Sequence, residues 1–153
     1  TLGTADAIAA TNPIDLIKIQ PHLSVCEQDA AFGADLYARD PDLCCAMRKV
    51  APLAKALTPY VAWASGIRRD ETTNRAGMGV VEWDDKHDMV KVNPLANWTE
   101  DDVDRYIADN NILVNPLLSD GYGSVGCAPC TRRGEGRSGR WAGLSKVECG
   151  LHA

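Results

Sequence analysis

The sequence is organised around the stretch Gly126-Cys127-Ala128-Pro129-Cys130-Thr131-Arg132-Arg133, which runs on to Gly139-Arg140-Trp141. Two cysteines separated by two residues can place both sulfur atoms on one metal centre, because the turn between them brings their side chains to the same side. A second pair, Cys44-Cys45, lies far upstream and can supply two further ligands only if the fold brings it there. The arginines that follow form a cationic segment in a chain with a formal net charge of −5. The stretch therefore predicts a four-thiolate site beside a segment that binds anions.

The length and composition are those of a single globular domain. With 153 residues, of which 45% are hydrophobic, the chain can bury a sizeable core. Its acidic balance argues against generic binding to nucleic acids or membrane surfaces. No run approaches the ~18 apolar residues that a membrane helix needs, and no signal-peptide pattern opens the chain. Six cysteines without a secretory signal are typical of ligands and reactive thiols in a reducing compartment, so we expect a cytoplasmic protein.

The start of the chain indicates a piece of a longer protein. The first residue is Thr1 rather than Met, and residues 1–8 already have a helical composition. We therefore expect further sequence upstream.

The expected elements alternate between strands and helices. Strands are predicted at residues 15–19, 60–66, 80–83 and 89–92, the second buried in a parallel sheet and the last two paired as a hairpin. Helices are predicted at residues 4–10, 25–37, 43–57 and 100–110, the third capped by Asp42 and broken at Pro52, the fourth opened by a capping box from Thr99 to Asp102. Loops and a mobile tail follow Pro116. This order of elements indicates an α/β fold.

The paired cysteines fit an iron–sulfur cluster better than a structural zinc site. Thiolates bind both zinc and iron–sulfur clusters. A structural zinc ion normally takes its ligands from two spaced pairs, whereas adjacent helical residues such as Cys44 and Cys45 point about 100° apart. A cubane cluster presents irons at separate corners, so each adjacent cysteine can take one. Buried inert thiols are a third interpretation, and the C-x-x-C pair alone is also compatible with a redox dithiol.

Four arginines and one acid stand between residues 132 and 140, namely Arg132, Arg133, Arg137, Arg140 and Glu135. Guanidinium groups bind phosphate and sulfate oxygens through paired hydrogen bonds. For Arg132 and Arg133, a solvated basic loop is an equally good interpretation. Arg137 and Arg140 lead into Trp141, which favours an ordered position over a ligand.

The chain ends in Glu148-Cys149-Gly150-Leu151-His152-Ala153. A cysteine on a glycine-flanked terminus is exposed and mobile, so it can reach a substrate and then a partner protein. His152 or a nearby arginine would favour the thiolate of Cys149. Without further context, a terminal thiol with no function is the simpler interpretation.

Together these motifs resemble those of the assimilatory adenylyl-sulfate reductases, the iron–sulfur branch of the phosphoadenylyl-sulfate reductase family. The resemblance extends from the segment around Leu16, through residues 66–70 and 93–95, to the last residues. It implies a doubly wound α/β domain with a mostly parallel sheet, related to the ATP pyrophosphatases, over residues 1–141, followed by a mobile catalytic tail at residues 142–153. The phosphate-binding Ser-Gly-Gly loop and the first strands of that sheet are expected upstream of Thr1.

The resemblance implies a metal centre. A 4Fe–4S cluster would be ligated by Cys44, Cys45, Cys127 and Cys130. Lys49 would link this cluster to the sulfate of the substrate. Cys26 matches no functional position and is expected to be a packed thiol.

The resemblance also implies the substrate-binding and catalytic residues. Arg137 and Arg140 would bind the phosphosulfate group, and Arg68 or Arg69 would meet the nucleotide. Cys149 would be the nucleophile.

The implied reaction is the thioredoxin-dependent reduction of adenosine 5′-phosphosulfate to sulfite and AMP in sulfate assimilation and cysteine biosynthesis. The Cys149 thiolate would attack the sulfate sulfur and leave a Cys–SO3⁻ adduct, from which thioredoxin releases sulfite. The cluster would act electrostatically and structurally. Two alternatives stay open: reduction of the 3′-phosphorylated nucleotide, and a non-catalytic zinc or cluster module with an anion-binding loop. The oligomeric state also stays open, and a homo-oligomer is compatible with the sequence.

Overall fold

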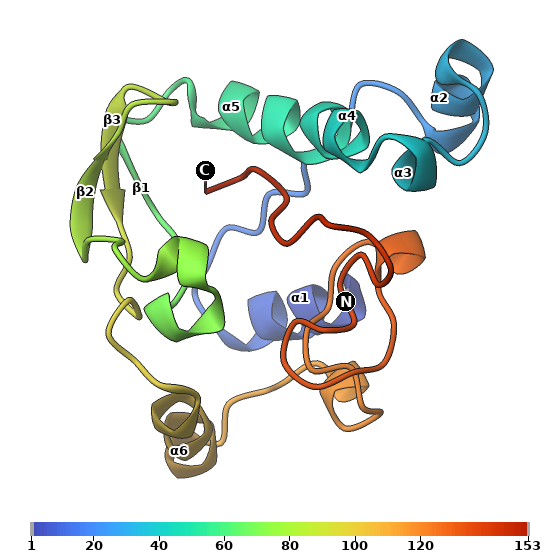
Figure 1. Ribbon diagram of the computed structural model, residues 1–153. Coiled ribbons are helices and arrows are strands. Elements are labelled where there is room, and N and C mark those ends of the chain that lie inside the picture. The colour runs from blue at the N-terminus through green and yellow to red at the C-terminus, as the bar shows by residue number, and fades with distance from the viewer. Residues whose placement is uncertain (1, 153) are drawn as a thin grey trace. The chain divides into compact units, whose positions relative to one another are not determined.

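The computed structural model describes residues 2–152 (Figure 1), which divide into two compact units. The first unit is formed by residues 2–15 and 59–116. The second unit is formed by residues 16–58 and 117–152. Within the described residues, no helix has the length and apolar character needed to cross a membrane.

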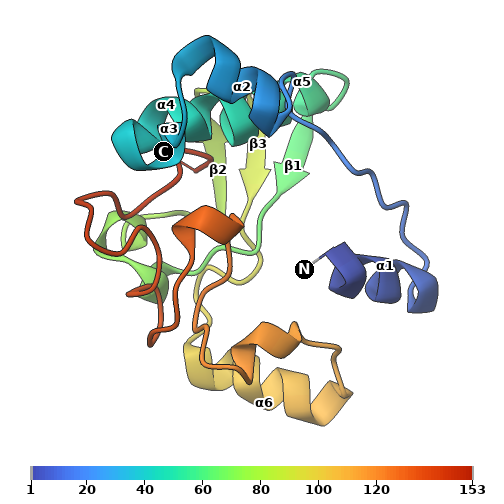
Figure 2. The same cartoon turned by 90° about the vertical axis from the view of Figure 1, so that its right-hand side faces the viewer.

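The first unit contains a three-stranded sheet in the order β1-β3-β2. Strand β3 (Met89–Val92) lies between the other two, as Figure 2 shows. It pairs in parallel with β1 (Ala62–Ala64) and antiparallel with β2 (Val81–Asp84). The predicted hairpin and the α/β class are therefore confirmed.

The apolar run at residues 60–66 contains a strand, as predicted, but the strand is not buried. Strand β1 occupies the centre of that run, but Val61 is 86% exposed and both alanines of the strand are exposed. The strand lies at the edge of the sheet and is paired on one side only. The central strand β3 instead buries Met89 and Lys91.

The first unit also holds two helices and two short 3₁₀ turns. Helix α1 (Leu2–Thr11) and helix α6 (Glu100–Asn110) follow the sequence prediction closely. Thr99 Oγ1 accepts a hydrogen bond from the Asp102 N–H, and the Asp102 carboxylate accepts one from the Thr99 N–H, so the predicted capping box is confirmed. The turns η2 (Arg69–Glu71) and η3 (Thr73–Arg75) follow strand β1.

The second unit begins with an extended segment and two short helices. Residues 15–19 form no strand, which contradicts the prediction; β-branched residues favour an extended backbone, but a strand also needs a hydrogen-bonded neighbour. The single helix expected at residues 25–37 is divided into α2 (Val25–Phe32) and α3 (Leu36–Arg39). Gly33, with a φ of 80°, ends the first of these.

A continuous run of three helical elements follows (Figure 1). Helix α4 (Pro41–Cys45) passes into the π-helical turn η1 (Ala46–Val50) and then into α5 (Ala51–Leu57). Pro52 does not break the run, which continues from η1 through the proline into α5. The hydrogen-bond register instead changes in η1, just before the proline.

Beyond Pro116 the chain is mostly loop, as predicted, with short turns at η4 (Pro116–Leu118) and η5 (Ala128–Cys130). An antiparallel bridge pairs Thr131 with Arg140. The Trp141 N–H donates to the Cys130 carbonyl at 3.0 Å, which extends the same contact. The C-x-x-C turn and the arginine loop therefore form one hydrogen-bonded structure.

Candidate active site

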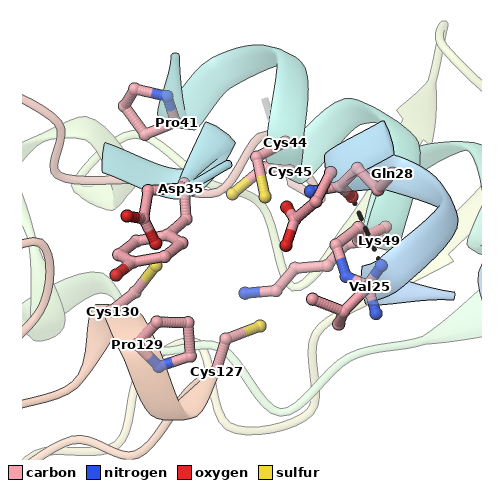
Figure 3. Close-up of a pocket in the computed structure, with 13 residues that line it drawn as sticks. Val25, Gln28, Asp35, Pro41, Cys44, Cys45, Lys49, Cys127, Pro129 and Cys130 are labelled. Carbon is pink, nitrogen blue, oxygen red and sulfur yellow. Dashed lines mark hydrogen bonds between the residues drawn. The ribbon is translucent and has the colours of Figure 1, made fainter. Parts of the chain in front are cut away.

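Four cysteines from two distant parts of the sequence line one cavity of about 380 Å³ in the second unit (Figure 3). Cys44 and Cys45 end helix α4, and Cys127 and Cys130 flank the turn η5. Their sulfur atoms are spread around the cavity rather than gathered at one point (Figure 3). Among the side chains of residues 2–152, no group of three or more His, Cys, Asp or Glu is placed to hold a single metal ion.

Local capping fixes the direction of helix α4. The carboxylate of Asp40 accepts a hydrogen bond from the Leu43 N–H at 2.9 Å, so Asp40 is the N-cap and the predicted cap Asp42 is not. The reason is Pro41, which occupies the first helical position and leaves the cap to the residue before it.

The C-x-x-C turn is held by Thr131. Its hydroxyl donates to the Cys127 carbonyl at 2.9 Å and accepts from the Gly126 N–H at 3.1 Å. The absence of a side chain at Gly126 leaves room for Arg140, since an added Cβ would lie 2.3 Å from its Nη2 and would displace the guanidinium. The guanidinium therefore passes directly over the backbone that precedes Cys127.

Burial controls the chemistry of the cysteine thiols. Cys44 is 9% exposed and Cys45 is 6% exposed. Burial raises the pKa of Cys44, Cys45 and Cys130, and the nearby Lys49 ammonium opposes this increase without cancelling it. Metal binding to these thiols would therefore release protons and would become weaker as the pH falls.

Lys49 extends from η1 into the cysteine-lined cavity, where its ammonium group lies between the sulfur-bearing walls (Figure 3). Its Nζ atom is 5.8 Å from the centre of the Trp141 ring. Arg140 and Lys146 also stand over this ring, at 4.5 and 5.6 Å. Trp141, which is 3% exposed, is thus a buried aromatic platform for three cations.

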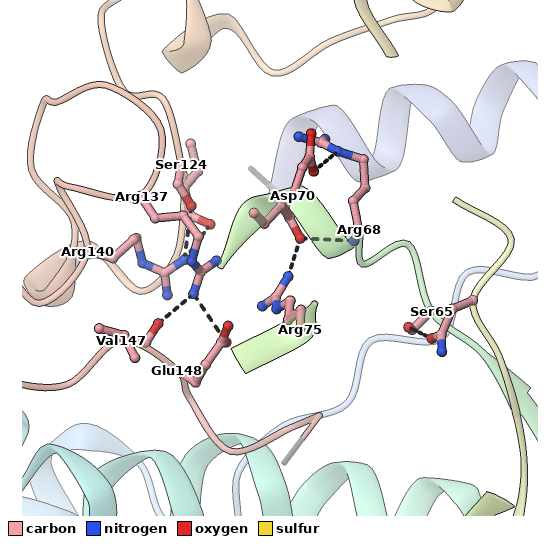
Figure 4. A network of polar contacts seen from close by, with 12 residues as sticks. Ser65, Arg68, Asp70, Arg75, Ser124, Arg137, Arg140, Val147 and Glu148 are labelled. Carbon is pink, nitrogen blue, oxygen red and sulfur yellow. Dashed lines mark hydrogen bonds and ion pairs between the residues drawn. The ribbon is translucent and has the colours of Figure 1, made fainter. Parts of the chain in front are cut away.

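Arg137 and Arg140, the two arginines expected to bind the substrate anion, have different hydrogen-bond partners. Nη1 of Arg140 makes only long contacts of 3.4 Å, to Ser124 Oγ and the Val125 carbonyl. Its buried Nε has no hydrogen-bond acceptor within the described residues. Nη2 of Arg137 donates to the Val147 carbonyl at 2.9 Å and lies 3.3 Å from the Glu148 carboxylate (Figure 4). Arg140 thus retains donor capacity, while Arg137 is engaged by the tail.

The tail is packed against the helical run of the second unit. Lys146 forms an ion pair with Asp42 of helix α4. Gly150, with a φ of 77°, lies against Val50, since an added Cβ would be 3.7 Å from Val50 Cγ2. Cys149 is half-buried and close enough to Cys45 to act on its ionisation. His152 is half-buried as well.

Arg68 and Arg69 belong to the first unit, where both donate to neighbouring groups. Nε of Arg68 lies 2.9 Å from Asp70. Arg69 donates to the Met78 carbonyl and to Asn97, each at 2.6 Å. These contacts hold the turns after strand β1, and a role for either arginine in nucleotide binding stays a prediction.

Cys26 was expected to be a packed thiol but is exposed. Gln28, Tyr37 and Arg48 line the cavity and were not predicted as site residues. Cys26 is exposed on helix α2, which turns Gln28 inward instead. Gln28 accepts from Arg48 Nη1 at 3.3 Å, and its side chain hydrogen-bonds Cys44. Tyr37 also lines the cavity. Gln28 stands between Glu27 and Asp29, so the sequence carries no local signal that it points inward.

Comparison with known proteins identifies the family of the chain. The family model described as the phosphoadenosine phosphosulfate reductase domain matches residues 1–133. The chain is 55% identical to the adenosine 5′-phosphosulfate reductase of Streptomyces coelicolor over 156 aligned residues, covering 99% of this chain and 66% of that protein. It is 51% identical to the proteins of the same name from Mycolicibacterium smegmatis and Rhodococcus opacus, covering 66% and 64% of those proteins. The chain therefore spans slightly less than two thirds of the length of these curated relatives.

A solved structure shares the fold. The crystal structure of phosphoadenylyl-sulfate reductase from Candida auris, in complex with phosphate, matches with a TM-score of 0.71 at 27% identity. The match covers 84% of this chain and 63% of that one. On the evidence of the family match and these relatives, the chain belongs to the phosphoadenosine phosphosulfate reductase family.

Proposed function

We propose that this chain acts in the reduction of adenosine 5′-phosphosulfate to sulfite and AMP, with Cys149 as the nucleophile. The observation that carries the proposal is the convergence within the second unit: the tail thiol, the four-cysteine cavity and the cations around Trp141 share one region. An anionic substrate needs cations, and a thiol nucleophile needs access to it.

The four cavity cysteines are proposed as ligands of a 4Fe–4S cluster. Their chemistry fits, because thiolates are the usual ligands of such clusters and the sulfur atoms are distributed around a cavity in a way that suits ligation at separate corners. A bound cluster would supply electrostatic stabilisation and a structural link between the two cysteine pairs. The electrons of the proposed reaction come from thiols.

In the first step, the Cys149 thiolate forms a bond to the sulfate sulfur, and the bond from this sulfur to the bridging oxygen breaks. AMP leaves with the electron pair, and a Cys–SO3⁻ adduct remains. Both reactants are anions, so their approach needs cationic groups around the sulfate oxygens. The positions of Lys49 and Arg140 over the ring of Trp141 support this role, and Arg137 lies three residues before Arg140 in the same loop.

In the second step, a thiolate of thioredoxin attacks the Cys149 sulfur and sulfite leaves. A mixed disulfide forms, and the second thiol of thioredoxin resolves it, so two thiols supply both electrons. This step requires Cys149, which is half-buried, to become accessible to a protein. A reducing cytoplasm would maintain the thioredoxin pool.

Adenosine 5′-phosphosulfate, which has no 3′-phosphate, is favoured as the substrate by the names of the relatives. The relatives that are at least half identical to this chain are named for adenosine 5′-phosphosulfate, whereas the structural neighbour named for the 3′-phosphorylated form is 27% identical. Turnover of the two nucleotides under identical conditions separates these substrates.

The reaction is tested by mass spectrometry of the cluster-loaded protein after incubation with adenosine 5′-phosphosulfate in the absence of thioredoxin. We expect one sulfonate adduct, on the peptide that contains Cys149. An adduct on another cysteine, or no adduct on a preparation that releases sulfite once thioredoxin is added, would contradict the assigned nucleophile.

A further inference from the structure

A carboxylate of the tail, that of Glu148, lies beside Arg137 in the arginine loop, residues 132–140. The carboxylate of Glu148 lies 3.3 Å from Nη2 of Arg137, and the adjacent Val147 carbonyl accepts from the same nitrogen at 2.9 Å (Figure 4). The side chains of Arg137 and Glu148 are only 18% and 15% exposed, so the pair is largely shielded from water. Such a pair is screened less than a surface ion pair and is correspondingly harder to replace by solvent.

A carboxylate and a sulfate or phosphate group are alternative partners for the same donors. Each offers two oxygens to the fork of a guanidinium group. Arg140, three residues further on, has long hydrogen bonds and a buried Nε without an acceptor in the described part of the chain. An incoming anion would therefore find donors on Arg140 available and would compete with Glu148 for Arg137.

Glu148 is also the residue next to Cys149, so its release would affect the nucleophile directly. The rest of the tail has a separate attachment, because Lys146 pairs with Asp42 and stands over Trp141. This second contact uses a different cation and a different carboxylate, and it does not depend on Glu148. The tail thus has at least one attachment that an anion can exchange, at Arg137, and another, at Asp42, that does not depend on Glu148.

From this geometry we infer that Glu148 is an internal competitor for the substrate anion, and that an anion entering at Arg137 frees the segment that carries Cys149. The inference rests on the proposed function, since it treats Arg137 as part of the anion site. It assigns Glu148 as a positioning residue whose carboxylate couples the arrival of substrate to the exposure of the thiol.

Competition makes a prediction that a purely structural ion pair does not. Glu148→Gln removes the competing charge while keeping the shape of the side chain. We expect the variant to bind inorganic sulfate about fivefold more tightly than the wild type, which is the scale of a modest ion pair. If Glu148 only held the loop in order, the same substitution would leave sulfate affinity unchanged or weaken it.

The test uses the cluster-loaded full chain and two measurements at constant ionic strength, with chloride balancing sulfate. Calorimetry gives the sulfate affinity, and peptide mass spectrometry gives the rate of Cys149 alkylation by iodoacetamide. In the wild type, sulfate should accelerate alkylation of Cys149. In Glu148→Gln, alkylation without sulfate should already be about fivefold faster, and sulfate should add little.

Glu135→Gln is the matched control, because it removes the same charge from an exposed residue of the same loop. It should behave as the wild type in both measurements. Unchanged or weaker sulfate binding by Glu148→Gln would overturn the inference. If that variant reduces adenosine 5′-phosphosulfate normally while showing neither effect, only the inference fails. If the sulfate effects appear but no protein forms the sulfonate adduct, the proposed reaction fails instead.

Discussion

Two buried polar clusters, the one around Asn93 in the first unit and the one around Trp141 in the second, differ in how fully their hydrogen-bonding groups are paired. In the first unit, Asn93 is completely buried, and its side chain is fully paired: it accepts from Ser65 at 2.6 Å and donates to the Gly79 carbonyl and to Glu82 at 2.9 Å. In the second unit, the indole Nε1 of Trp141 and Nε of Arg140 are buried without acceptors within residues 2–152.

This difference separates a structural network from a binding site. Buried polar groups are normally paired, because an unpaired one loses its hydration without compensation. The saturated network around Asn93 holds the sheet and has nothing left to offer a ligand. The hydrogen-bond donors around Trp141 can still bind an acceptor, and cations and thiols lie in the same region. Substitutions in the first unit should therefore affect stability, and those in the second unit should affect chemistry.

The largest expected effect is on chemistry. Cys149→Ser should abolish sulfite release, because a hydroxyl is a far weaker nucleophile than a thiolate and cannot be reduced by thioredoxin afterwards. The visible spectrum of the cluster should be unchanged. Sulfite production with thioredoxin as the reductant measures the first effect.

Cys26→Ser provides the matched control, since Cys26 is an exposed thiol on helix α2. It should retain wild-type turnover. Residual sulfite release by Cys149→Ser at more than a trace level would remove this residue from its role.

The next effect is on stability. Asn93→Ala should lower the free energy of unfolding by about 3 kcal/mol, because it leaves several buried partners unpaired. Urea denaturation measures this change. Asn110→Ala is the control, as an exposed helical asparagine whose loss should cost less than about 0.5 kcal/mol. Equal effects of the two substitutions would show that the network does not stabilise the sheet.

A smaller effect is expected for the free donors. Arg140→Ala should weaken capture of adenosine 5′-phosphosulfate by about 2 kcal/mol, the scale of a hydrogen bond to a charged group. The ratio kcat/KM reports this loss, and the unfolding free energy should change little. Arg133→Ala, at an exposed arginine of the same segment, should leave kcat/KM nearly unchanged. Equal losses in both variants would indicate a diffuse electrostatic effect.

Comparison with the sequence analysis shows where local rules suffice. Helix α6 and the β2–β3 hairpin were predicted well because their signals, the Thr99 capping box and the alternation around each strand, lie within the elements themselves. The segment at residues 15–19 was predicted wrongly because a strand depends on a neighbour that composition does not reveal.

The residue types of the candidate site could be predicted from the sequence, but the contacts between these residues could not. The spacing of the cysteines indicated a shared centre, but only the fold could show that they line one cavity. Three contacts depend on loop conformations: the stacking of cations on Trp141, the passage of Arg140 over Gly126, and the pairing of Glu148 with Arg137. Each joins residues whose separation in the sequence has no fixed periodicity.

The smallest expected effect is a pH dependence in the first unit. Burial opposes the ionisation of Glu82, but hydrogen bonds from the Gly79 N–H, Asn93 and Lys91 outweigh it and lower the pKa of this carboxyl. The folded-state pKa thus lies below the ordinary value of about 4.3. The stability from this group is present above that value and is lost as the pH falls through the folded-state pKa.

Glu82→Gln should therefore lose less stability than the wild type when the pH is lowered from about 5 to about 3, although it is less stable at neutral pH. Urea denaturation across this range gives the comparison. Parallel pH profiles of the two proteins would show that Glu82 has no such linkage.

The central claim, that two distant cysteine pairs hold one iron–sulfur centre, is tested most directly by metal and acid-labile sulfide analysis of the protein purified without oxygen. The account predicts about four iron and four sulfide per chain, and their loss in Cys127→Ser. One zinc per chain with no labile sulfide, or full iron loading in that variant, would contradict it.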